Sequence, residues 1–239
     1  MIRDWVSTCV VALVLGCGGS TPESSTAQSG DPQSEGSRRG GSSLQYQSEI
    51  GALDEGKVQD TFQRISPKLS ACFSQGSQRI PYLSGTVSFK VRVAEDGSAR
   101  WAYLKDSTLG DHQTEQCMLS ALKSATWPKP VGGEGLAGNE NISFEPGGDE
   151  RPPVEWSPEQ LGDAFKKVRP ALDRCRQSAG TGPVKTTLYV ETDGKPKAIG
   201  ASTSDEKGDG AVQCIVDALK DVKFPSPGSY ASKVTVSIE

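Results

Sequence analysis

Residues 85–97 read GTVSFKVRVAEDG, and residues 182–194 read GPVKTTLYVETDG, in the same register 97 positions later. Both stretches begin with glycine, alternate apolar with polar residues and end in Asp-Gly. Alternation with a period of two is typical of a strand with one buried face, and Asp-Gly is typical of a hairpin turn. The chain therefore contains the same strand and turn twice.

An amphipathic helix precedes each strand. Apolar residues recur at spacings of 4, 3, 4 and 3, and the second copy of this stripe follows 103 positions after the first. That spacing is typical of one helix face. Asp54 and Ser157 are candidate N-caps, and Pro67 and Pro170 should kink or restart each helix. The stripes are Val58, Phe62, Ile65, Leu69 and Cys72, then Leu161, Phe165, Val168, Leu172 and Cys175.

The rest of each copy repeats one order of elements. A weaker strand is followed by a second helix that ends at an aromatic-proline pair, and a last strand closes the copy. We therefore expect an α+β fold of two tandem α-β-β-α-β domains, residues 54–145 and 157–239, each with a three-stranded antiparallel sheet packed on helices. A Pro/Glu-rich linker, residues 146–156, should join them. The paired segments are 99–104 and 196–201, then helices opening at Gln116 and Gln213, then 142–144 and 234–238.

The N-terminus indicates export. Residues 5–16 are mostly apolar, a run too short for a bilayer span of about 20 residues but typical of a signal peptide. Residues 14–17, Val-Leu-Gly-Cys, resemble a bacterial lipoprotein lipobox, which implies removal of residues 1–16 and acylation of Cys17. The alternative is an ordinary signal peptide that carries a cysteine by chance. Residues 17–53, rich in Ser and Gly, should form a disordered tether. Under the lipoprotein resemblance, Gly18 favours the outer membrane. We expect the chain to face the periplasm, with the cell surface as the alternative.

Composition excludes several classes of function. Lys and Arg number 26 against 30 Asp and Glu, so there is no basic excess for nucleic-acid binding, and 34% apolar residues exclude a polytopic membrane protein. Residues 133–138, GEGLAG, spell a dinucleotide fingerprint, but they follow a helix where the motif requires a strand, so we expect a flexible loop. The single histidine, His112, should be a solvated loop residue. We expect no catalytic residues, metal or cofactor.

The six cysteines partition without remainder. Cys9 leaves with the signal peptide and Cys17 takes the lipid, so two remain in each copy. Four cysteines allow three pairings, but their equivalent positions favour one disulfide within each copy. The rival interpretation is a four-cysteine metal site, which usually has Cys-x-x-Cys pairs that this chain lacks. We therefore expect the disulfides Cys72–Cys117 and Cys175–Cys214.

These features together resemble the AgmX/PglI C-terminal domain family and, more distantly, the periplasmic C-terminal domain of TonB energy transducers. The resemblance covers most of residues 54–239. It implies small α+β domains with protein contacts and no catalysis in the envelope of gliding bacteria. Family members usually hang from an inner-membrane helix, whereas this chain carries a lipobox. The matching positions are the four cysteines, the Gly-x-Val strand starts at Gly85 and Gly182, the Asp-Gly turns, and the aromatic-proline pairs Trp127-Pro128 and Phe224-Pro225.

One surface of the first copy is a candidate partner-binding face. If the disulfide holds both helices on one side of the sheet, the other side carries the cations Lys90 and Arg92 and the rings of Trp101 and Tyr103. Exposed aromatic and cationic side chains are favoured at binding faces. The alternative is that the linker or the second domain covers the rings.

We therefore expect a protein-interaction module of a cell-envelope assembly, such as one for motility or surface-polymer export. A partner should bind through a sheet edge or the aromatic face, and the lipid should anchor the chain in the membrane. A structural spacer without a ligand is the first alternative. An unrecognised envelope hydrolase is the second, because paired carboxylates could hide among the 30 acids.

Lipid attachment at Cys17 can be tested by metabolic labelling of cells with a clickable palmitate. The wild type should incorporate label and Cys17→Ser should not, because the lipobox cysteine is the acceptor. Cys9→Ser is the matched control and should label fully, since Cys9 lies in the removed segment. Equal labelling of the wild type and Cys17→Ser would refute the lipoprotein interpretation.

Overall fold

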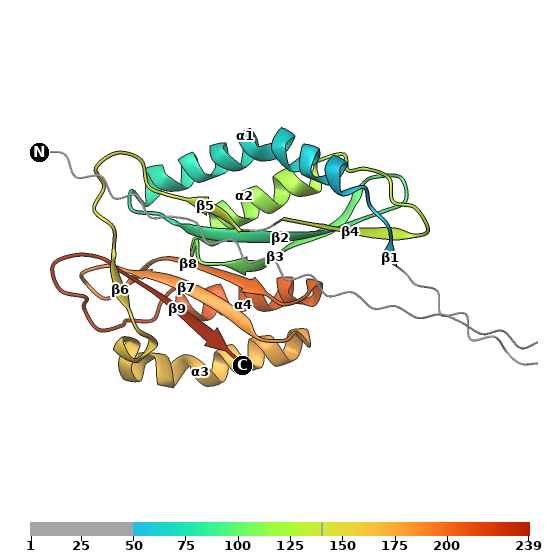
Figure 1. Ribbon diagram of the computed structural model, residues 1–239. Coiled ribbons are helices and arrows are strands. Elements are labelled where there is room, and N and C mark those ends of the chain that lie inside the picture. Colours follow the sequence, from blue (N-terminus) through green and yellow to red (C-terminus); the bar gives the residue numbers. More distant parts are fainter. Residues whose placement is uncertain (1–49, 140) are drawn as a thin grey trace, which may run out of the picture. The chain divides into compact units, whose positions relative to one another are not determined.

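The structure is a computed structural model that describes residues 50–139 and 141–239 (Figure 1). The chain divides into two compact units, Met1–Gln45 and Tyr46–Glu239, and every described residue belongs to the second. The expected signal peptide, Cys17 and nearly all of the tether therefore lie outside the described residues.

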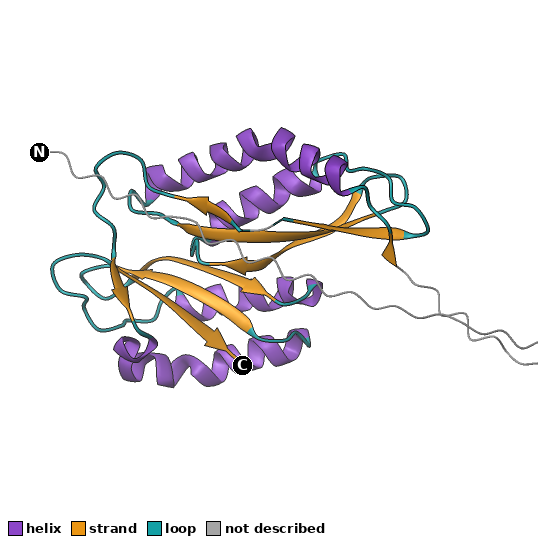
Figure 2. Ribbon diagram, in the orientation of Figure 1, coloured by secondary structure: helices purple, strands orange, loops and turns teal. Residues whose placement is uncertain are grey.

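The first half contains a five-stranded sheet in the order β1-β4-β2-β3, with β5 also paired to β2. The strands β1 and β4 are parallel, and the other pairs are antiparallel. Both helices lie on one side of this sheet (Figure 2). The elements are β1 (Ile50–Gly51), α1 (Glu55–Arg79), β2 (Gly85–Val93), β3 (Ala99–Ser107), α2 (His112–Lys123), β4 (Glu134–Gly138) and β5 (Ile142–Phe144).

The second half contains a four-stranded sheet in the order β6-β9-β7-β8. Its edge strand β6 is parallel to β9, as β1 is parallel to β4. Two short 3-10 turns precede the two helices. The elements are β6 (Val154–Trp156), η1 (Pro158–Leu161), α3 (Gly162–Ala179), β7 (Val184–Val190), β8 (Pro196–Thr203), η2 (Glu206–Gly208), α4 (Asp209–Leu219) and β9 (Ser232–Ile238).

The expected α+β class is confirmed, but the three-stranded antiparallel layout is wrong. Each sheet gains a parallel edge strand, β1 inside the expected tether and β6 inside the expected linker. The expected loop at 133–138 contains β4, which pairs with β2 over four residues. These strands are short, and β4 contains two glycines and no β-branched residue, so their sequences show no strand pattern. Pairing with a neighbouring strand is what orders them.

The helices also differ in detail from the expectation. The helix α2 begins at His112, capped by the Asp111 side chain, so His112 is a helical residue and not a loop residue. The helices α1 and α3 continue through Pro67 and Pro170 without a break. Both prolines are exposed, so water can satisfy the carbonyl that each proline leaves unpaired.

Both expected disulfides are confirmed. Cys72 on α1 bonds Cys117 on α2, with 5.7 Å between Cα atoms, and Cys175 on α3 bonds Cys214 on α4, with 5.6 Å between Cα atoms. The bonds span 45 and 39 positions of sequence. Loops of this length correspond to about 4 kcal/mol of stabilisation each in the chain-entropy description. Each bond therefore holds two helices together on one face of a small sheet.

A buried carboxylate joins the two halves. Glu115 in the first turn of α2 is 1% exposed. Its Oε1 accepts hydrogen bonds from Ser107 Oγ at 2.7 Å and Gly110 N at 3.3 Å, and its Oε2 accepts from Ala201 N on β8 at 3.2 Å. A Cβ at Gly200 would stand 2.5 Å from Oε2. The carboxylate can therefore reach β8 only because residue 200 is glycine.

A second contact lies at the side chain of Tyr189, which packs within the core of the first half. Its hydroxyl donates to Ser84 O at 2.8 Å and accepts from Ser84 N at 3.1 Å. Beside it, Tyr82 donates to Glu191 Oε1 at 2.6 Å. These contacts show that the two halves share buried surface, although their repeated sequences contain no signal for it.

The stability of this arrangement should depend on the protonation of Glu115. Burial raises the pKa of Glu115 from 4.5 to about 7, although hydrogen bonds from Ser107, Ala201 and Gly110 oppose the shift. The folded state therefore holds the proton more tightly than the unfolded state. The contribution of Glu115 to the free energy of unfolding should be full below about pH 4.5 and fall by up to about 3 kcal/mol as the pH rises to about 7.

Urea denaturation of the wild type and Glu115→Gln across that pH range measures this contribution. The stability difference between the two proteins should change with pH, because only the wild type has the buried acid. Glu95→Gln, at an exposed acid, is the matched control and should parallel the wild type. A difference between the wild type and Glu115→Gln that stays constant with pH would contradict the expected shift.

Candidate functional site

The alternation of β2 places two sets of side chains on opposite faces of the first sheet. Phe89, Val91 and Val93 are buried in the core on the helix side, so Lys90 and Arg92 lie on the other side. We call that other side the outer face. Within the sheet, Arg92 stands opposite Trp101 of β3 and Leu136 of β4, and Lys90 stands opposite Tyr103 and Gly138. Residues directly opposite share a face. The outer-face cluster therefore consists of Lys90, Arg92, Trp101, Tyr103, Glu134 and Leu136.

Charge and aromatic contacts order this cluster. The guanidinium carbon of Arg92 lies 5.2 Å from the centroid of the Trp101 ring, within the range of cation–π attraction. Arg92 Nη1 is 3.3 Å from Glu134 Oε2, and Arg100 pairs with the other oxygen of the same carboxylate. The rings of Trp101 and Tyr103 are 5.3 Å apart. One carboxylate thus holds two arginines beside an aromatic pair.

The structure places all four candidate residues, Lys90, Arg92, Trp101 and Tyr103, on this face, but they differ in exposure. Trp101 is partly exposed, whereas Tyr103 is only 8% exposed, so the expected exposure of Tyr103 is wrong. Tyr103 lines a small enclosed cavity with Thr203 and Asp209 of the second half. Burial first, and then the carboxylates of Glu206 and Asp205, raise the pKa of its hydroxyl. The second half therefore covers Tyr103.

The exposed apolar residues gather at one sheet edge, which the sequence analysis missed. Four large apolar residues are exposed in the described part of the chain. Three of them, Ile50 at 59%, Val131 at 78% and Leu136 at 39%, flank the junction of β1 and β4. The fourth, Val154 at 38%, lies on β6 of the second half. The sequence offers one weak signal for this edge, Leu136, a single large apolar residue among glycines and alanine in a segment expected to be a loop.

The strand β4 is only partly covered along this edge. The strand β1 pairs with Glu134 and Gly135 and ends there. No strand within residues 50–139 and 141–239 pairs with the outer side of β4 from Leu136 to Gly138. An open edge of this kind can accept an added strand.

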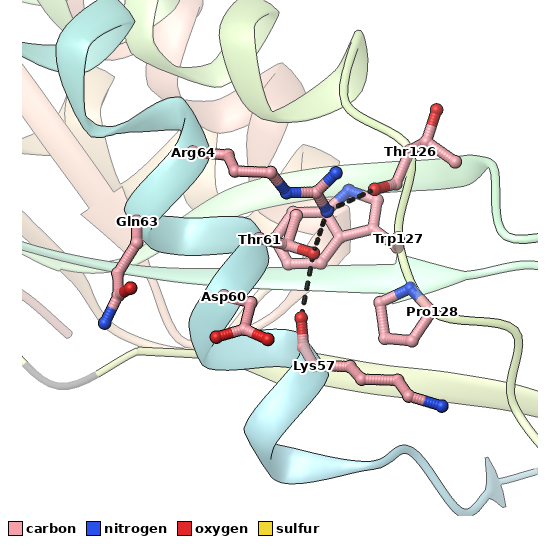
Figure 3. Close-up of a pocket in the computed structure, with 8 residues that line it drawn as sticks. All are labelled: Lys57, Asp60, Thr61, Gln63, Arg64, Thr126, Trp127 and Pro128. Carbon is pink, nitrogen blue, oxygen red and sulfur yellow. Dashed lines mark hydrogen bonds between the residues drawn. The ribbon is translucent and has the colours of Figure 1, made fainter.

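A groove of about 680 Å³ lies between α1 and the segment after α2 (Figure 3). Its central side chain, Arg64, donates from Nη2 to Thr61 Oγ1 at 2.7 Å and Thr126 O at 3.4 Å. Thr61 Oγ1 in turn donates to Lys57 O at 2.9 Å. The indole of Trp127, on the groove lining, donates to Leu122 O at 3.2 Å. The side chains of Thr61 and Arg64 are thus engaged in hydrogen bonds within the groove wall.

The described residues hold neither a metal cluster nor a membrane-spanning helix. Across 50–139 and 141–239, no three His, Cys, Asp or Glu side chains come together as a metal site would require. The described helices include none that combines the length and the apolar character of a membrane span. His112 Nε2 lies 3.2 Å from Gln213 Oε1, a contact between α2 and α4. The outer-face cluster and the open edge of β4 therefore form the candidate site.

The two aromatic residues of the cluster should differ in their contribution to stability. Tyr103→Ala should lower the free energy of unfolding by about 3 kcal/mol, because it leaves a cavity between the halves. Trp101→Ala should cost about 1 kcal/mol, since it removes a partly exposed ring and one aromatic contact. Urea denaturation measures both values. Equal losses would show that the two rings are equally buried in solution.

Comparisons with known proteins supply no precedent for this site. No family model matches the chain, and neither a curated protein nor a solved structure matches it. The functional argument therefore depends on the geometry of the outer-face cluster and of the β4 edge.

Proposed function

We propose that the protein is a lipid-anchored, periplasm-facing envelope protein whose first half binds an extended segment of a partner protein along the open edge of β4. The observation that carries this proposal is the concentration of exposed apolar residues, Ile50, Val131 and Leu136, at that edge. Exposed apolar groups that cluster beside polar residues are typical of protein-binding surfaces. The edge of β4 adds backbone groups that an extended chain can pair with.

The anchor and compartment come from the sequence and agree with the disulfides. The lipobox-like residues 14–17 support acylation at Cys17 and export. Disulfides form and persist in oxidising compartments such as the periplasm, and this chain has one in each half. Gly18 after the lipid-bearing cysteine supports the outer membrane as the final location.

The choice of edge follows from how the halves pack. The strand β3 is the other edge of the first sheet, and Ser107 N on it donates to Ser202 Oγ of the second half at 3.0 Å. Beside it, Lys185 pairs with Asp106 at 2.6 Å. The second half therefore covers the C-terminal end of β3. An added strand on β4 would instead lie next to Leu136 and within reach of Arg92 and Trp101.

The two tandem domains, which we take to be AgmX/PglI-like, would then have unequal roles. The second half has Ala198 and Gly200 where the first has Trp101 and Tyr103. Ala198 packs in the core of the first half, and Gly200 lies against Glu115. The corresponding face of the second half is thus used for internal packing. We propose that the second half supports the first and that the first binds the partner.

Photo-crosslinking in cells tests the site. A photo-reactive amino acid at Leu136 should crosslink to a partner, and mass spectrometry should place the crosslink in an extended segment of it. The same amino acid at Val154, which is equally exposed on the equivalent edge of the second half, is the matched control.

The identified partner then allows an affinity measurement with purified proteins. Leu136→Lys should weaken binding at least tenfold, because a charge on the edge opposes strand addition, and Trp101→Ala should weaken it about thirtyfold, as truncation of an aromatic anchor does. Val154→Lys should bind like the wild type. Equal crosslinking at both positions, or unchanged affinity in both outer-face variants, would reject the proposed function.

A further inference from the structure

Lys90 extends along the outer face toward the open edge, and within residues 50–139 and 141–239 no ion pair engages its ammonium group. A Cβ at Gly138 would stand 2.8 Å from Lys90 Nζ and 2.9 Å from Lys90 Cδ, so the side chain lies directly over this glycine of β4. In the part of the chain that the structure describes, no carboxylate lies within 4.0 Å of its ammonium group and no hydrogen bond engages it. Lys90 is also half-buried. A partly buried ammonium group is more stable beside a carboxylate, and the described residues place none beside Lys90.

The surroundings of Lys90 add positive charge. Arg92 and Arg100 share the single carboxylate of Glu134. Together with Lys90, these three side chains carry two positive charges in excess. This local excess contrasts with the whole chain, whose net charge is -4. Two further acids, Asp205 and Glu206, act on the Tyr103 hydroxyl on the β3 side. Lys90 extends to the opposite side, toward β4.

The register of β4 predicts which residue of an added strand would face the Lys90 ammonium group. In a strand added beside β4, the residues opposite Gly138 and Leu136 lie two positions apart and both project on the outer face. The residue opposite Gly138 meets the Lys90 ammonium group, and the residue opposite Leu136 meets an exposed apolar side chain. We infer that the partner segment carries Asp or Glu opposite Gly138 and an apolar residue opposite Leu136. This inference rests on the proposed function.

Glycine at position 138 is part of this arrangement. Any larger residue would occupy the space that Lys90 crosses, because the would-be Cβ lies within 3.1 Å of three atoms of the lysine side chain. The end of a lysine side chain can move at little cost, so Gly138→Ala should leave the fold intact and displace only the ammonium group. Gly138→Ala therefore moves the positive charge without removing it, whereas Lys90→Met removes it.

Selection of peptides on the full-length chain tests the inference without a known partner. A phage-displayed library of random short peptides is panned against the wild type, purified in detergent with both disulfides intact. We expect the selected peptides to share an acidic residue two positions from an apolar residue. Panning against Lys90→Met should lose the acidic position and keep the apolar one. Lys68→Met, at an exposed lysine of α1, is the matched control and should select the wild-type pattern.

Affinities of a selected peptide and its Glu-to-Gln form complete the test. The wild type should bind the acidic form about fivefold more tightly, the size expected for one partly screened ion pair. Lys90→Met and Gly138→Ala should bind both forms equally. Peptides that bind at the edge with no acidic preference would overturn this inference and leave the proposed function standing. The proposed function itself would be overturned if none of the selected peptides bound more weakly to Leu136→Lys than to the wild type.

Discussion

The contact between the Glu115 carboxylate and β8 determines which surfaces of this protein remain open. Its oxygens accept from Ser107 and Gly110 in one half and from Ala201 in the other. A fully buried carboxylate is costly unless donors surround it, so the two halves must keep this register to satisfy it. The same register brings Ser107 of β3 against Ser202 of β8. The second half therefore lies against the C-terminal end of β3, whereas no strand of the described residues pairs with the outer side of β4 from Leu136 to Gly138.

This packing makes two repeated halves unequal. Each half has the same helix stripe, hairpin, disulfide and parallel edge strand. In the second half, small residues such as Ala198 and Gly200 let the sheet lie against its partner. In the first half, Trp101 and Arg92 stand at the corresponding face and stay partly exposed. Duplication therefore produced one surface for internal support and one that faces outward.

Local features of the sequence were good predictors of local structure. The Asp54 cap is present, since its side chain accepts from Lys57 N at 3.0 Å, and both disulfides join the cysteines that equivalent positions had paired. The strand alternation placed Lys90 and Arg92 opposite the core correctly. The sequence did not predict the parallel edge strands, because two or three residues are too few to show the alternation of a strand. The sequence also carried no sign that Glu115, one acid among 30, would be buried.

The sequence alone thus determined the repeated order of helices and strands, the disulfide pairs and the face on which the cationic and aromatic residues lie. These depend on spacing within one copy, where the period of a helix or strand dictates neighbours. Only the tertiary structure decided that Tyr103 is covered, that the second half contacts the end of β3, and that no described strand pairs with β4 from Leu136 to Gly138. These outcomes depend on how two sheets that are distant in sequence pack together. At their contact, the buried Glu115 carboxylate accepts a hydrogen bond from Ala201 N beside Gly200.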